Sequence, residues 1–255
     1  MTSTFFSAAE TSMLLSPSKS DGKEMLMFTF MEMLLHKVFT VKFEMHRPHP
    51  KERESIHTFL YRGENFYAFR PRKHQEIFIE AFPDDKDKIQ LRPFAKNVYA
   101  SIGGFSEYKK YYIYYPLSHG GYFRKSNLLS RMNFYFLSEK GQELQKLYSK
   151  KLGEVNSGFI SWIKADPGKA VNSTMELGAS IMLIKDFDFK MLDILNLYAK
   201  NKGISAISTT LTNDFARIES ATLIKFNDLW DDLDTSLDWF QSGGLVGDMP
   251  GGVSI

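Results

Sequence analysis

The amino-acid sequence predicts an α+β fold that is mostly helical and contains a small antiparallel sheet. Several long segments place apolar residues at helical spacing, and Lys23–Phe39 and Ser138–Lys164 are the clearest of them. Phe39–Met45 instead alternates apolar and polar residues, as a half-buried strand does. With 255 residues, of which 43% are hydrophobic, the chain can bury one large core or two ordinary ones.

The first elements follow from local composition. Residues 1–22 are rich in Ser, Thr and Ala and are expected to form a disordered tail. The helix over Lys23–Phe39 has only a narrow polar strip, so it should lie in the core. A hairpin is expected over residues 56–69, around the polar turn 62–65. Two short helices should follow: His74–Phe82 and Pro93–Ile102.

A central stretch, residues 108–151, is predicted to form strand, loop, strand and helix. Tyr108–Tyr115 is rich in aromatic residues, which favour strands, and Ser118–Gly121 has the residues of a turn. Asn133–Leu137 is a second aromatic run. Ser138 then offers a hydroxyl group as the N-cap of a helix that should continue to Lys164.

This hairpin and helix resemble the end of a winged-helix domain, and the motif that carries the resemblance is Leu137-Ser138-Glu139-Lys140-Gly141. In that family the second wing strand runs into a Leu-(Ser/Thr)-x-x-Gly turn and a long helix. The resemblance implies a winged-helix-like domain over residues 23–164. The extra hairpin at 56–69 departs from the family pattern and leaves open which helix would be the recognition helix.

The remaining chain divides by composition. Residues 165–240 are predicted to be a helical region that begins after the break at Asp166–Gly168, and the Gly-rich residues 241–255 are predicted to be disordered. Aspartates alternate with aromatic and leucine residues from Asn227 onward. Such a segment can dock on its own protein, on a protein partner or on a second copy, and the candidate contact residues are Trp230, Leu233, Leu237, Trp239 and Phe240.

The same central stretch carries the best functional signal. From Tyr108 to Arg131 there is no acidic residue, while lysines, arginines and tyrosines are frequent. Cationic side chains neutralise phosphates and aromatic rings stack on bases, so double-stranded DNA is a candidate partner. The alternative is a solvated hairpin whose tyrosines fill a sheet face. The candidate nucleic-acid-binding residues are Lys96, Asn97, Lys109, Lys110, Arg124, Lys125 and Arg131.

Other classes of function find little support. The chain has no cysteine, and it lacks the motifs of nucleophile elbows, phosphate loops and dinucleotide sites, so neither an enzyme nor a cofactor is expected. His46, His49 and His57 lie near glutamates, but intervening prolines favour exposed loop residues over a metal site. Charged residues interrupt the most apolar stretch, so we expect no membrane segment and a cytoplasmic location.

These observations favour a nucleic-acid-binding or regulatory protein that uses a basic wing. The alternative function is a winged-helix protein-interaction module that binds no nucleic acid, because a fold alone does not determine function.

Overall fold

The computed structural model describes residues 6–47, 51, 53–124, 135–185, 187, 190–202 and 234–239. The fold is α+β and mostly helical, as predicted. Its elements are α1 (Ala8–Leu15), α2 (Gly22–Leu35), β1 (Phe39–His46), β2 (Ser55–Arg62), α3 (Lys73–Glu80), β3 (Lys88–Gln90), α4 (Leu91–Ile102), α5 (Phe105–Glu107), the π-helix η1 (Tyr108–Tyr114), α6 (Tyr115–His119), α8 (Glu139–Ala165), α9 (Pro167–Leu177), the 3₁₀-helix η2 (Gly178–Leu183) and α10 (Lys190–Asn201).

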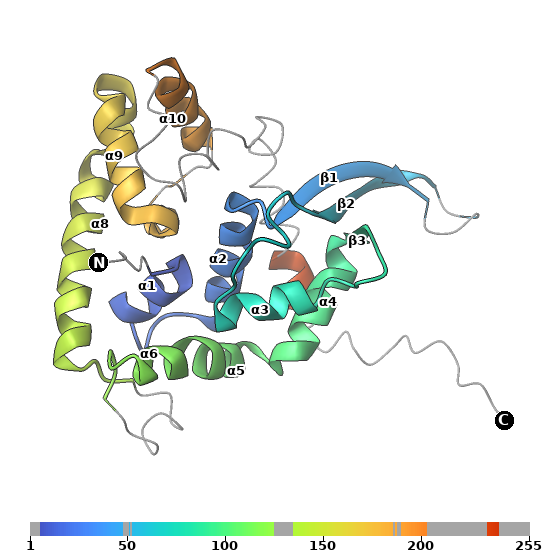
Figure 1. Ribbon diagram of the computed structural model, residues 1–255, viewed down its shortest axis with the longest axis horizontal. Coiled ribbons are helices and arrows are strands. Elements are labelled where there is room, and N and C mark those ends of the chain that lie inside the picture. The colour runs from blue at the N-terminus through green and yellow to red at the C-terminus, as the bar shows by residue number, and fades with distance from the viewer. Residues whose placement is uncertain are drawn as a thin grey trace.

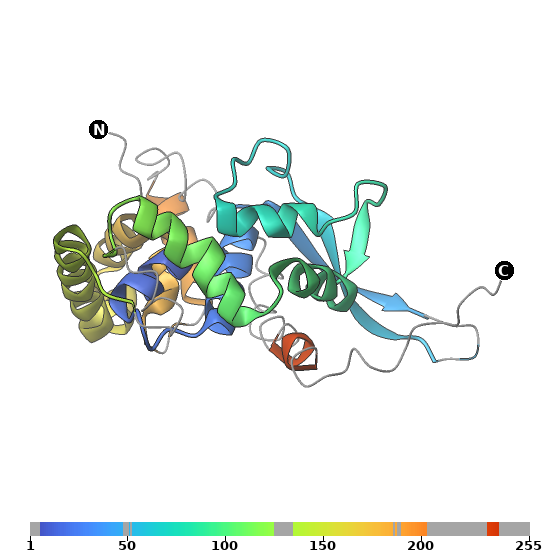
Figure 2. The ribbon, with the colours of Figure 1, turned by 90° about the horizontal axis from the view of Figure 1, so that it is seen from below.

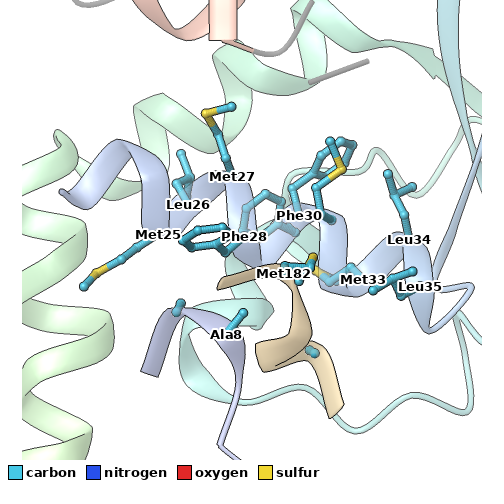
Figure 3. Close-up of a cluster of buried hydrophobic side chains, with 14 of the residues drawn as sticks. Ala8, Met25, Leu26, Met27, Phe28, Phe30, Met33, Leu34, Leu35 and Met182 are labelled. Carbon is cyan, nitrogen blue, oxygen red and sulfur yellow. The ribbon is translucent and has the colours of Figure 1, made fainter. Parts of the chain in front are cut away.

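Helix α2 lies at the centre of the core, because its sequence is apolar on almost every side. Its methionine and phenylalanine side chains point in different directions from the helix axis, and Ala8 and Met182 lie beside it (Figure 3). This confirms the predicted core helix, although the helix ends at Leu35 rather than at Phe39. Lys37 adopts a left-handed conformation with φ of 52°, which redirects the chain into β1.

The prediction of a disordered tail over residues 1–22 is wrong for the part that the structure describes, from Phe6 onward, because α1 forms there. Ser7 caps this helix: its hydroxyl accepts a hydrogen bond from the Glu10 backbone N–H, and the Glu10 carboxylate accepts one from the Ser7 N–H. Ala8 and Ala9 are fully buried. Their small side chains let the helix pack closely on its neighbours. The Ser-, Thr- and Ala-rich composition that predicted disorder here is therefore that of a buried helix.

The sheet has the strand order β1-β2-β3, and both pairs are antiparallel. The β1 strand confirms the prediction from alternation. The expected strand at residues 66–69 is wrong, because successive turns fold that segment and β2 pairs with β1 instead. Strands β1 and β2 form an arm that projects from the body on the side away from α8 (Figure 1).

The predicted strand Tyr108–Tyr115 is also wrong, because α5, η1 and α6 form one continuous helical rod there (Figure 2). Buried positions in the rod recur five residues apart through the π-helix, as Tyr108 with Ile113 and Lys109 with Tyr114 show. Strand alternation would separate the members of each pair onto opposite faces. Burial against the core therefore decides the helical conformation of this aromatic segment.

The C-terminal helices share the core with the N-terminal half. Asp166 ends α8 and caps α9, so the predicted break at Asp166–Gly168 is a tight helix–helix junction. The hydroxyl groups of Thr11 in α1 and Ser180 in η2 are hydrogen-bonded at 2.8 Å. One cluster of buried apolar side chains runs from Ala8 to Leu237. The predicted disordered segment 241–255 lies outside the described residues.

Candidate nucleic-acid interface

A short ribbon replaces the predicted hairpin, further along the chain. Phe123 and Leu137 form an antiparallel bridge. The Arg124 N–H donates to the Phe136 carbonyl at 2.8 Å, and the Ser138 N–H donates to the Tyr122 carbonyl at 3.0 Å. We call residues 122–138 the wing segment. Its two ends are held side by side, and its first strand begins after the Gly120-Gly121 turn rather than before it.

Each residue of the Leu-Ser-Glu-Lys-Gly motif except Glu139 has a defined contact at this ribbon. The Ser138 hydroxyl accepts from the Gly141 N–H at 3.1 Å as the N-cap of α8, and it donates to the Gly121 carbonyl at 2.6 Å. Lys140 donates to the Gly120 carbonyl at 2.9 Å. A Cβ atom on Gly141 would lie 2.1 Å from the Tyr122 carbonyl oxygen. The motif therefore joins the wing segment to α8, and only glycine fits at its last position.

Aromatic packing fixes the base of the wing segment on the rod. The ring of Tyr114 lies 4.5 Å from that of Tyr135 and 5.2 Å from that of Phe123, measured between centroids. Tyr114 thus contacts both strands of the ribbon. Burial raises the pKa of Tyr135 to about 12, so its hydroxyl group stays protonated at physiological pH.

Lys109 does not lie at a phosphate-accessible surface, which corrects its predicted role. It is buried, its ammonium group donates to the Ser20 carbonyl at 2.8 Å, and it sits 5.0 Å from the Tyr135 ring centroid. Burial lowers the pKa of Lys109. Its contacts hold the rod, the loop after α1 and the wing base together.

The other described candidate cations lie on three separate parts of the fold. Arg124 is exposed at the edge of the ribbon, and Lys110 is partly exposed on the rod, with its ammonium group 5.2 Å from the Tyr111 ring centroid. Lys96 is exposed on α4. Asn97 donates a side-chain hydrogen bond to the Ala81 carbonyl at 3.1 Å, which occupies one of the donors proposed to read bases. Lys125 and Arg131 lie outside the described residues.

Three of the candidate partner-contact residues, Trp230, Leu233 and Phe240, lie outside the described residues. The helical turn 234–239 packs on its own chain. Leu237 is only 1% exposed and belongs to the main core, which corrects its role as a partner contact. The guanidinium group of Arg92 stacks on the Trp239 ring at 4.2 Å.

Lys23 of α2 forms ion pairs with the two aspartates of this turn, Asp234 and Asp238. These carboxylates raise the pKa of Lys23 against the opposing effect of its burial. The described turn of this segment, residues 234–239, therefore docks on its own protein.

Sequence reasoning missed a buried polar cluster where α1, α2, α3 and the rod meet. Arg72 pairs with Glu10, and the Tyr108 hydroxyl is hydrogen-bonded to Thr29 at 2.8 Å. His74 is fully buried, and desolvation lowers its pKa. No local motif signals this cluster, because its members come from four elements.

Comparison with protein-family models, with curated proteins and with solved structures found no match. Within the described part of the chain, no group of three or more His, Asp or Glu residues is placed to hold a metal ion. None of the described helices combines the length and the apolar character needed to cross a membrane.

Proposed function

We propose that this protein binds nucleic acid through the wing segment. The observation that carries the proposal is the clamped ribbon: its bridge at Phe123 and Leu137 brings together the ends of a segment that contains Arg124, Lys125 and Arg131 and no acidic residue. A cationic segment with fixed ends can follow a phosphate backbone, and the affinity that it supplies depends on salt.

The surroundings of the ribbon support the same reading. The exposed guanidinium group of Arg124 extends from its edge. Lys140 lies 4.1 Å from the Tyr122 ring centroid and adds a second cation next to the ribbon, although Glu139 beside it reduces the net positive charge. The proposal therefore concerns the wing segment as a whole rather than a single base-reading residue.

The test is binding of a fluorescein-labelled DNA duplex, measured by anisotropy over a series of salt concentrations. The triple variant Arg124→Ala/Lys125→Ala/Arg131→Ala should weaken binding and reduce the salt slope by about 0.9 for each phosphate that is no longer neutralised. The matched control is Lys146→Ala/Lys150→Ala/Lys164→Ala, which removes the same charge from exposed positions on α8. Absence of salt-sensitive binding by the native protein, or equal losses of affinity in the two variants, would overturn the proposal.

A further inference from the structure

The outer face of the three-stranded sheet carries aromatic rings covered by lysine side chains. Opposed residues of antiparallel strands share a face, so the register places Val41 with Leu60 on the core side and Lys42 with Phe59 on the outer side. Val41 and Leu60 belong to the main core, whereas Phe59 is buried without being part of it. Neighbouring side chains on the outer face therefore cover this ring.

Two lysines lie over the rings from opposite edges of the sheet. The Lys42 ammonium group is 4.5 Å from the Tyr61 ring centroid. The Lys88 ammonium group is 4.6 Å from the Phe59 centroid and 5.8 Å from that of Tyr61. His46 packs edge-on against Phe59 at 5.4 Å and against His57 at 5.4 Å. The face thus has four rings in adjacent positions, with a cation on each side.

One carboxylate lies within this arrangement and orients it. Glu44 accepts hydrogen bonds from Lys88 and from the Tyr61 hydroxyl. These two hydrogen bonds, that of Lys88 first, lower the pKa of Glu44, so it is ionised at neutral pH. Glu44 thus holds the Tyr61 ring through the hydroxyl group of Tyr61. Its ion pair is with Lys88 and not with Lys42.

We propose that this outer sheet face binds single-stranded nucleic acid, with bases stacked on Tyr61 and the neighbouring rings and phosphates held by Lys42 and Lys88. Base–aromatic stacking is stronger than a solvent-exposed contact between a lysine and a ring, so a base can take the place of the ammonium group. The displaced lysine then reaches the adjacent phosphate. Aromatic rings at strand spacing can stack on successive bases. An acidic peptide could pair with the lysines but has no bases to stack on these rings.

This site differs in position and ligand from the wing segment, so the two proposals can fail separately. The probe is a fluorescein-labelled oligodeoxythymidine, measured by anisotropy at low salt and compared with the labelled duplex. Tyr61→Leu should weaken oligodeoxythymidine binding by about tenfold, which corresponds to about 1.4 kcal/mol. Tyr61→Phe keeps the ring and should bind as the native protein does, although it loses the hydrogen bond to Glu44.

Two controls locate the effect. Tyr111→Leu removes an exposed tyrosine from the rod and should leave oligodeoxythymidine binding unchanged. The α8 variant Lys146→Ala/Lys150→Ala/Lys164→Ala lies outside both proposed sites and should likewise leave it unchanged. The double variant Lys42→Ala/Lys88→Ala should weaken it and reduce its salt dependence. Equal affinities of the native protein and Tyr61→Leu, equal losses in the α8 variant and in Lys42→Ala/Lys88→Ala, or no binding at low salt would overturn the proposal.

Discussion

Two aromatic-rich segments, Phe39–Met45 and Tyr108–Tyr115, were both predicted to form strands, and only the first does. In β1, polar residues separate Phe39, Val41 and Phe43, so one face packs on the core and the other is solvated. Tyr108–Tyr115 lacks this alternation and has apolar side chains on all sides. The difference teaches that the period of apolar residues, rather than aromatic content, decides between strand and helix when a segment lies against a core.

The strongest test of this difference uses Tyr111 and Ile113, which strand alternation would place on the same face of the segment. Ile113→Ala should destabilise the protein by about 2–5 kcal/mol, because Ile113 is fully buried in the helical rod. Tyr111→Ala should cost about 0.5 kcal/mol or less, since Tyr111 is 46% exposed. Urea unfolding followed by circular dichroism measures both. Similar losses of stability at the two positions would indicate a strand.

A second comparison concerns the point where the wing segment joins α8. Gly141→Ala should destabilise the protein by about 1–3 kcal/mol, because the new methyl group would collide with the Tyr122 carbonyl oxygen. Gly153→Ala in the same helix has open space and should stabilise by about 0.5–1 kcal/mol. Thermal and urea unfolding of the two variants test this contrast. Stabilisation by both would show that the ribbon does not contact α8 at Gly141.

A smaller effect is expected at the helix cap. Ser138→Ala removes the acceptor of the Gly141 N–H and the donor to Gly121, which should cost about 1 kcal/mol. Ser161→Ala is the control and should have little effect, because the Ser161 hydroxyl donates to the Gly158 carbonyl of its own helix. Ser138→Asp retains a capping oxygen but has no donor for the Gly121 carbonyl, so it should recover only part of the stability in urea unfolding. Equal stability of Ser138→Ala and the native protein would contradict the cap.

The smallest expected effect lies on the solvated face of the arm. The pKa of Glu44 is lowered by its hydrogen bonds from Lys88 and Tyr61. The resulting stabilisation is present above the pKa of an unfolded glutamate and is lost as the pH falls through the lower folded value. Titration of the Glu44 carboxyl by NMR should show this low pKa, and Lys88→Ala should raise it toward the ordinary value. An unchanged titration in Lys88→Ala would mean that the pair does not persist in solution.

Local patterns predicted several elements because local physics suffices for them. Ser138 caps α8 where its hydroxyl was expected to act. The alternation of β1 and the fully apolar character of α2 likewise identify a half-buried strand and a core helix. Within the candidate interface, the sequence showed the absence of acidic residues and the motif that joins the wing segment to α8.

Tertiary packing decided the remainder, because the deciding contacts join residues far apart in the chain. Lys109 looks like a surface cation in the sequence, but the Ser20 carbonyl and the Tyr135 ring enclose it. The wing segment begins at Tyr122 rather than at Tyr108, because burial on several sides makes the rod helical. The outer sheet face assembles from β1, β2 and β3, whose pairing no local pattern specifies. The sequence by itself thus determined which segments could be helix or strand, and the shared core selected among them by burying the faces that fit it.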